Sequence, residues 1–176
     1  MNHAEQMNDL FQAVQDGHVE KLKSLLDADP EFANTENQDG LTPLGYASHY
    51  GQAGVVRLLL EHGADVNALS HSKISFIPSN TALHAALAGE RSPEVIQLLL
   101  EHGASTSILD SDGQYALHSA AFHTDQTELI EVLLQHGADP SVLNSSGQTA
   151  LDIALERGNT STASCLQAAT VAQQQQ

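Results

Sequence analysis

Histidine is the residue type of this sequence that could most readily do chemistry, because ten histidines are present beside a single cysteine. Three of them, His62, His102 and His136, precede a glycine at equivalent places in similar stretches. Helices that pack side by side lie about 8–10 Å apart, whereas an imidazole nitrogen binds zinc at about 2 Å. Equivalent histidines on stacked helices therefore cannot share one zinc ion. We interpret them as residues at helix C-termini, where a protonated imidazole is favourable, and we predict neither a metal nor another cofactor.

No catalytic motif accompanies these histidines. The sequence contains no HExxH, GxSxG, phosphate-binding loop or GxGxxG pattern. Cys165 has no patterned histidine nearby and is interpreted as a small core residue. His49 and His123 are candidates for contacts that titrate near neutral pH. We predict that the protein is not an enzyme, and the enzymatic alternative is a site formed by His49, His123 and Asp112 around a small molecule.

The charge of the chain is strongly one-sided. Asp and Glu number 22 against 6 Lys and Arg, which gives a net charge of −16. The phosphates of nucleic acids and anionic membranes repel such a chain, whereas a partner protein with a basic surface is attracted to it. The same charge also fits a role in solubility alone. Because no secretory signal and no apolar run of about 18 residues is present, we expect a cytoplasmic protein that is a monomer on its own.

The elements that carry these residues repeat along the chain. One motif occurs three times, as VVRLLLEHGADVN (55–67), VIQLLLEHGASTS (95–107) and LIEVLLQHGADPS (129–141). A second motif precedes each copy, as LTPLGYA (41–47), NTALHAA (80–86) and QYALHSA (114–120), and begins once more as QTALDIA (148–154). Measured from Thr42, Thr81, Tyr115 and Thr149, the periods are 39, 34 and 34 residues.

Each repeat predicts a pair of short helices. A turn that contains glycine leads into a small, Ala-rich first helix, which lets neighbouring copies approach closely. The second helix carries a Val/Ile/Leu stripe and ends at His-Gly, where glycine suits the left-handed position that follows a helix. One such pair cannot bury its apolar faces alone, whereas stacked pairs can. The sequence therefore predicts an all-α solenoid of stacked helix-turn-helix units.

These motifs resemble the ankyrin repeat, whose pattern is G-x-T-P-L-H-x-A-A, then a helix rich in Val and Leu, then G-A-D-V-N. G-L-T-P-L-G, S-N-T-A-L-H and G-Q-Y-A-L-H match the first part, and EHGADVN, EHGASTS and QHGADPS match the second. The resemblance covers about residues 5–168 and implies an ankyrin-repeat solenoid with finger loops. It also implies that the motif histidines, His84 and His118, tie down the turn into the first helix. Tyr115 replaces the motif Thr, which weakens that turn.

The predicted organisation is one domain over residues 1–170, with repeats at about 5–37, 38–76, 77–110, 111–144 and 145–170. The terminal copies have other residues where interior copies have Val or Leu, such as Lys21 at the start and Thr162 and Ala163 at the end. Polar outer faces are typical of capping repeats. The Gln-rich tail, residues 171–176, lacks periodicity and is expected to be disordered.

One connection between repeats is unusual. LSHSKISFIPSN (69–80) contains six more residues than the equivalent connections after Ser107 and Ser141. It brings Ile74, Phe76 and Ile77 into a finger where a polar turn is expected. Insertions in repeat proteins map to loops on one face, which is often the binding face. Either these residues anchor a partner, or Phe76 and Ile74 fold back to cover the adjacent repeat.

The resemblance implies that a partner protein contacts the finger tips and the exposed face of the first helices. The candidate positions are Gln38, Asp39, Leu41, Ile74, Phe76, Ile77, Asn80, Ser111, Asp112 and Gln114 in the fingers, and His49, Tyr50, Phe122 and His123 at the ends of first helices. We predict a non-catalytic protein-binding module, with an inhibitor or immunity-type regulator as one form of it. The alternatives are a scaffold that self-associates through the apolar loop and the small-molecule enzyme described above.

Overall fold

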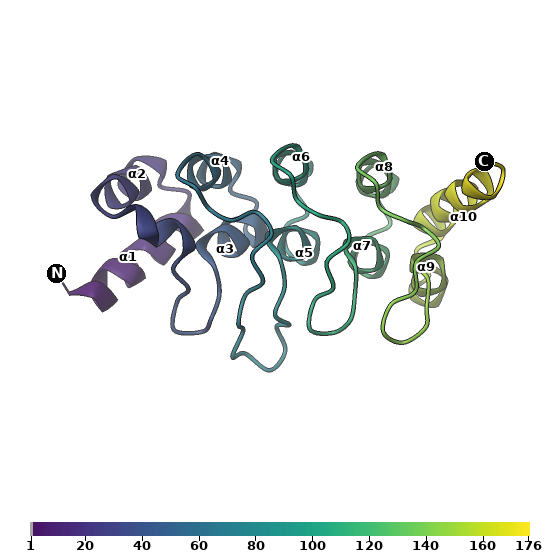
Figure 1. Ribbon diagram of the computed structural model, residues 1–176, viewed down its shortest axis with the longest axis horizontal. Helices are drawn as coiled ribbons and strands as arrows, with labels where there is room; N and C mark the ends of the chain where they lie inside the picture. Colours follow the sequence, from purple (N-terminus) through teal and green to yellow (C-terminus); the bar gives the residue numbers. More distant parts are fainter. Residues whose placement is uncertain (1) are drawn as a thin grey trace. The chain divides into compact units, whose positions relative to one another are not determined.

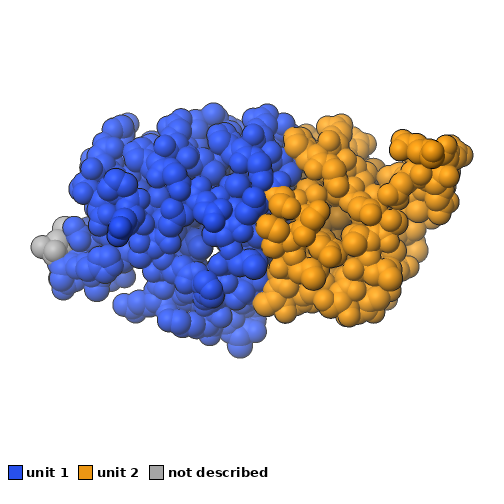
Figure 2. Space-filling view, viewed as in Figure 1, with its two compact units in different colours: residues 1–104 blue, residues 105–176 orange. Residues whose placement is uncertain are grey.

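The fold is built from helices. The computed structural model describes residues 2–176, and no strand occurs among them, which confirms the predicted all-α class. The chain comprises two compact units, residues 1–104 (unit 1) and residues 105–176 (unit 2), shown in Figure 2. Unit 1 contains α1 (His3–Asp16), α2 (Val19–Ala28), the 3-10 helix η1 (Pro30–Asn34), α3 (Pro43–His49), α4 (Ala53–Glu61), α5 (Ala82–Ala88) and α6 (Pro93–Glu101). Unit 2 contains α7 (Ala116–His123), α8 (Thr127–Gln135), α9 (Ala150–Arg157) and α10 (Thr160–Gln174).

Within unit 1, helix pairs stack in two layers (Figure 1). Helices α1, α3 and α5 follow one another in one layer, and α2, α4 and α6 in the other. Ala47 and Ala86 of the first helices are fully buried, as are Leu59 and Leu99 of the second helices. Each buried leucine contributes about 1.5–3 kcal/mol relative to an exposed one. The small alanines let the helices approach closely, and the leucines supply the buried apolar surface. Such short helices are therefore stable only as a stack.

Unit 2 has the same two layers, with α7 against α9 and α8 against α10. Its buried leucines and isoleucines include Leu117, Leu129 and Ile130. The single domain predicted over residues 1–170, with its five repeat boundaries, stays a prediction, because the two units are described separately.

The first helices begin at a hydroxyl cap in three of the four motif copies. The side-chain oxygens of Thr42, Thr81 and Thr149 accept hydrogen bonds from backbone N–H groups three residues later, at 3.0, 3.4 and 3.2 Å. Such caps stabilise a helix by about 1 kcal/mol. Tyr115 begins α7 and makes no side-chain cap. The weakened turn predicted at this substitution is therefore present.

The two motif histidines differ in their hydrogen bonds because residue 81 is threonine and residue 115 is tyrosine. His84 Nδ1 lies 2.8 Å from Thr81 Oγ1, so this histidine ties down the turn into α5 as predicted. His118 is buried and donates from Nε2 to the Gln148 carbonyl at 3.0 Å, but its Nδ1 has no hydrogen-bond partner among residues 2–176. Tyr115 lacks the threonine hydroxyl that would reach this nitrogen.

The three His-Gly histidines have the structural role predicted for them. In His62, His102 and His136, Nδ1 lies 2.8–2.9 Å from the carbonyl oxygen four residues earlier. Because a carbonyl only accepts, Nδ1 must carry the proton in each. The histidines therefore satisfy carbonyl groups at the ends of α4, α6 and α8.

The end of the chain differs from the prediction in two ways. Helix α10 continues to Gln174, so residues 171–174 are helical and the prediction of a disordered tail is wrong for them. Alanine and glutamine favour helices, and Gln173 donates to Asp139 Oδ1 at 3.0 Å. The expected polar outer face is also incomplete, because Thr162 is fully buried whereas Leu155 of α9 is 63% exposed.

Candidate functional site

The connections between repeats, here called fingers, share one backbone turn in three cases. The turn spans residues 37–41, 110–114 and 144–148. Its first residue is Asn37, Asp110 or Asn144, whose side-chain oxygen accepts two backbone N–H bonds at 2.9–3.0 Å. Asn and Asp suit this role because their short side chains fold back on the following backbone. The finger tips are therefore held by local hydrogen bonds rather than by burial.

The inserted finger keeps this base and lengthens the tip. Ser70 takes the place of the Asn or Asp: its N–H donates to the Asn80 carbonyl and its Oγ accepts from the Asn80 N–H, both at 3.0 Å. The extra residues lie between these two positions, and Ser72 N–H donates to Ser79 Oγ at 3.1 Å within them. Figure 1 shows this finger reaching further from the helices than the finger before it. The insertion thus leaves the closing contacts of the finger unchanged.

The inserted finger also rests on the finger before it. His71 N–H donates to the Gly40 carbonyl at 2.9 Å and Lys73 N–H donates to the Asp39 carbonyl at 2.9 Å. The Lys73 ammonium donates to the Gln38 carbonyl at 3.0 Å. A Cβ on Gly40 would lie 1.9 Å from the His71 carbonyl oxygen, so only glycine permits this approach. These contacts fix the orientation of the long finger.

The three apolar residues of the insertion have different environments. Ile74 and Ile77 are half-buried, and the Ile77 N–H donates to the Ile74 carbonyl in a turn at 3.0 Å. Phe76 is 84% exposed. Phe76 therefore does not cover the adjacent repeat, whereas the two isoleucines are partly withdrawn from solvent. A phenylalanine held outward on an ordered finger is the kind of side chain that anchors interfaces.

The C-terminal end of α3 in unit 1 carries a cluster of aromatic rings. Tyr46 contacts the Phe11 ring edge to face at 5.2 Å and the tilted Tyr50 ring at 5.1 Å between ring centroids. Tyr50 in turn contacts the His49 ring edge to face at 5.3 Å. The Tyr46 hydroxyl donates to Gln15 Oε1 at 3.2 Å. Burial, followed by the hydrogen bond with Tyr50, raises the pKa of Tyr46 to about 12. The Tyr46 hydroxyl therefore stays protonated at physiological pH, and His49 is the exposed member of the cluster.

The equivalent place in unit 2 carries a cation. Phe122 is 45% exposed, lies 4.9 Å from the His123 ring and is covered by the Arg157 guanidinium at 4.2 Å from the ring centroid. A contact of this kind contributes about 0.5–1 kcal/mol at an exposed position. The aromatic surface of unit 2 is therefore smaller than its phenylalanine suggests, because Arg157 occupies one face of the ring.

The predicted positions belong to both units. Gln38, Asp39 and Leu41, the insertion residues Ile74, Phe76, Ile77 and Asn80, and the ring pair His49 and Tyr50 belong to unit 1. Ser111, Asp112, Gln114, Phe122 and His123 belong to unit 2, where Gln114 Oε1 accepts from Asn144 Nδ2 of the next finger at 3.0 Å. The proposed enzymatic combination has His49 in unit 1 and His123 and Asp112 in unit 2. Neither unit alone assembles that site.

Several residues that contact these candidate positions or join the fingers were not predicted from the sequence. Tyr46 lies four residues before Tyr50, a helical spacing that places both rings on one face, so the sequence did contain a signal for it. Arg157 had no such signal, because its contact with Phe122 joins two helices. Glu36 and His71 were also missed, and their side chains pair at 2.8 Å between neighbouring fingers.

Among residues 2–176, no group of three or more His, Cys, Asp or Glu side chains is arranged to hold a metal ion. No helix in the same range has the length and apolar character needed to cross a membrane. The Cys165 thiol is half-buried, and burial together with Glu131 raises its pKa.

Comparison with known proteins identifies the repeats. A family model described as ankyrin repeats (3 copies) matches residues 10–110 and again residues 83–174. The similar curated proteins are much longer than this chain. Ankyrin repeat and SAM domain-containing protein 6 of Rattus norvegicus is 42% identical over 59 residues, which are 34% of this chain and 7% of that protein.

Two further relatives show the same partial coverage. Palmitoyltransferase akr1 of Schizosaccharomyces pombe is 36% identical over 63 residues, 36% of this chain and 10% of the relative. Serine/threonine-protein kinase VIK of Arabidopsis thaliana is 42% identical over 76 residues, 43% of this chain and 16% of the relative. The likeness to each is thus confined to a small part of the relative's length.

Proposed function

The chain belongs to the ankyrin repeat family, a family of protein–protein interaction modules, and we propose that it binds a partner protein through its finger tips and the exposed ends of its first helices. The observation that carries this proposal is the position of Phe76. Its side chain is 84% exposed at the tip of a finger whose backbone is bonded to the preceding finger. An exposed ring on a preorganised loop loses little conformational entropy when it enters a pocket of a partner.

The partner that fits this surface has basic groups around an apolar pocket. The net charge of −16 attracts a basic protein over long range and raises the association rate. The candidate contact residues include the exposed carboxylates of Asp39 and Asp112 at finger tips. The half-exposed rings Tyr50 and Phe122 extend the apolar surface on their respective units. Inhibition of a basic enzyme is the finer form of this proposal, and we expect the encounter to take place in the cytoplasm.

The test compares two exposed apolar residues. The full chain is immobilised, and proteins retained from a native cell extract at low and high salt are identified by mass spectrometry. Phe76→Ala should lose a basic protein that the parent chain retains in stoichiometric amount. Leu155→Ala is the matched control, because Leu155 is 63% exposed on α9 and lies outside the proposed surface. It should retain that protein, and addition of the chain to the identified partner then tests inhibition.

Self-association is the alternative, and the exposed Phe76 is the observation that favours it. Light scattering over a wide concentration range separates the two functions. A mass that stays that of one chain supports the binding module. A mass that rises with concentration in the parent chain, but not in Phe76→Ala, would establish the scaffold and overturn the proposal.

A further inference from the structure

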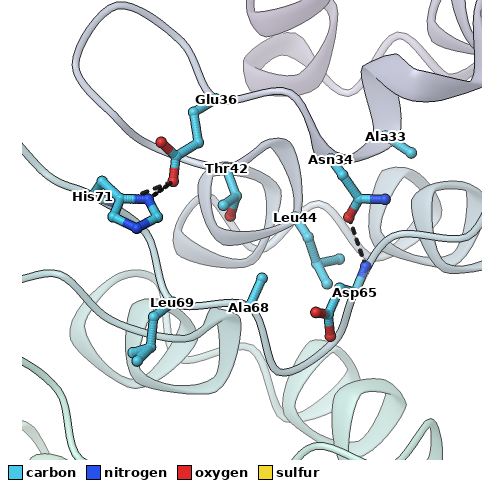
Figure 3. Close-up of a pocket in the computed structure, with 9 residues that line it drawn as sticks. All are labelled: Ala33, Asn34, Glu36, Thr42, Leu44, Asp65, Ala68, Leu69 and His71. Atoms are coloured by element: carbon cyan, nitrogen blue, oxygen red, sulfur yellow. Dashed lines mark hydrogen bonds and ion pairs between the residues drawn. The ribbon is translucent and has the colours of Figure 1, made fainter.

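A cleft opens in unit 1 between the bases of the first two fingers (Figure 3). Its volume is about 540 Å³. One wall is the segment 33–36, the other is the segment 65–71, and Thr42 and Leu44 at the start of α3 lie between them. Leu44 forms the buried floor. Ala68 and Leu69 supply accessible apolar surface, and Glu36 and Asp65 supply two carboxylates.

Two hydrogen-bonded bridges hold the walls together. Glu36 Oε1 lies 2.8 Å from His71 Nδ1 and also accepts from the His71 N–H at 3.1 Å. Asn34 Oδ1 accepts from the Asp65 N–H at 2.8 Å. Figure 3 shows these bridges on opposite sides of Leu44, so the apolar surface lies between them. The cleft is therefore formed before any ligand binds.

Glu36 stands where the other repeats have leucine. The residue just before the finger turn is Glu36 in the first finger, and it is Leu69, Leu109 or Leu143 in the others. These three leucines are 38–56% exposed. The residue paired with it, His71, corresponds to serine in the finger that follows residues 110–114, namely Ser145. A carboxylate and an imidazole thus replace an apolar and a small residue at this cleft.

The chemistry of the lining selects a cation with an apolar stem. Among the described residues that line the cleft, none is Lys or Arg, and the Glu36 side chain is only 28% exposed. The His71 imidazole is 82% exposed, so it can turn away into solvent while the His71 N–H keeps its bond to Glu36 and holds the two walls together. Arginine matches a carboxylate in a planar, two-bond arrangement and is more weakly hydrated than lysine. Its aliphatic stem can lie along apolar surface.

We propose that this cleft receives an arginine side chain of the partner protein, with its guanidinium on Glu36 in place of the His71 imidazole and its stem on Ala68 and Leu69. The proposal rests on the proposed function and specifies the partner: a protein that presents an exposed arginine next to the residue that meets the inserted finger. His71 then acts as the exchangeable occupant of Glu36 in the unbound chain.

The probe is N-acetyl-L-arginine methylamide, titrated into the 15N-labelled full chain and followed by NMR. We expect saturable shifts of the amides of Glu36, Ala68 and Leu69. Glu36→Gln should weaken binding about tenfold, the loss that corresponds to one charge-assisted hydrogen bond. It keeps an acceptor for the His71 N–H, so the finger should stay folded. His71→Ala should tighten binding, because it removes the competitor for Glu36.

The control variant removes the same charge elsewhere. Glu61→Gln lies at the exposed end of α4 in the same unit, outside the proposed binding surface, and should change the affinity less than twofold. Equal weakening by both variants would attribute the attraction to overall charge and overturn the proposal. So would equal binding of N-acetyl-norleucine methylamide, which lacks the cation. Phe76→Ala should bind the arginine probe like the parent chain.

The two proposals can fail separately. If the arginine probe does not bind but Phe76→Ala still loses the captured protein, only the cleft proposal is wrong. If the probe binds as described but no protein depends on Phe76, the cleft proposal stands and the assignment of the finger fails. Loss of the captured protein in both Glu36→Gln and Phe76→Ala supports both.

Discussion

The finger pairs of the two units share a backbone contact and differ in what they expose. In unit 1 the His71 N–H donates to the Gly40 carbonyl at 2.9 Å, and in unit 2 the Ser145 N–H donates to the Gly113 carbonyl at 3.0 Å. Beyond that bond, unit 1 adds a longer tip with Phe76, whereas the unit 2 finger closes after three residues. The comparison shows that the bond between fingers is independent of the length of the tip.

The side chains at the ends of α3 and α7 also differ between the units. His49 and Tyr50 in unit 1 correspond to Phe122 and His123 in unit 2. One pair extends a cluster of aromatic rings around Tyr46, and the other forms a contact with Arg157. Both arrangements sit on helices whose buried faces are alike. Exposed chemistry therefore varies between units while the packing beneath it is retained.

The largest effect should come from breaking the shared finger contact. Gly40→Ala places a Cβ 1.9 Å from the His71 carbonyl oxygen at a residue with φ +76°. The left-handed backbone costs about 1–2 kcal/mol with a side chain, and displacing the neighbouring backbone adds about 1–3 kcal/mol. We expect a loss of about 2–5 kcal/mol in urea unfolding, with faster amide exchange at His71.

Gly63→Ala isolates the backbone term in the same unit. Gly63 has φ +84°, and a Cβ there would meet no atom within 4 Å. This variant should lose only about 1–2 kcal/mol and leave exchange at His71 unchanged. Equal losses in the two variants would show that the contact between fingers contributes nothing to stability.

A smaller change in stability is expected from a substitution that makes the start of α7 in unit 2 more like the start of α5 in unit 1. Tyr115→Thr restores the hydroxyl that caps the first helix at Thr81 in unit 1, and it offers His118 Nδ1 the partner it lacks. We expect about 1 kcal/mol of added stability in urea unfolding. Tyr115→Val is the control, because valine has the shape of threonine without the hydroxyl. A gain of the same size in Tyr115→Val would refute the capping explanation.

The smallest expected effect is an opposite pH response of His62 in unit 1 and His118 in unit 2. The hydrogen bond to the Leu58 carbonyl, and then Asp27, raises the pKa of His62, whereas burial lowers the pKa of His118. The contribution of His62 is complete below the unfolded value of about 6.5 and is lost as pH rises through its higher folded pKa. That of His118 is present above about pH 6.5 and is lost as pH falls below it.

NMR titration of the two imidazoles measures this difference directly, with His62 expected to titrate at higher pH than His118. In urea unfolding at pH 5.5 and 7.5, His118→Gln should reduce the loss of stability on acidification, and His62→Gln should reduce the loss on alkalinisation. Coincident titration curves for the two rings would contradict the explanation given for both pKa shifts.

Most of the helical framework could be predicted from the sequence. Helix starts follow from Thr42, Thr81 and Thr149, and the ends of the second helices follow from His-Gly, because caps act within a few residues. The place of the insertion was also predictable, since its length stands out against a regular period. The exposure of Phe76 was one of two predicted outcomes. It depends on bonds from Lys73 and His71 to another finger, which no local pattern encodes.

The errors arose where long-range contacts decide the outcome. Thr162 was interpreted as part of a polar cap, but its hydroxyl donates to the Thr124 carbonyl at 3.0 Å, 38 residues away. The end of α10 was expected to be disordered, and its helix is extended by Ala and Gln with a bond from Gln173 to Asp139. The cleft at Glu36 could not be predicted from local patterns either, because its two walls come from different repeats.

The closed base of the inserted finger makes its tip a replaceable module. Ser70 and Asn80 bond to each other through main chain and hydroxyl, whatever lies between them. Segments of other lengths could therefore occupy residues 72–79 without changing the register of α5 or α6. A scaffold that separates loop content from repeat spacing in this way can acquire new recognition sequences by insertion, and unit 1 has the site at which a laboratory graft would start.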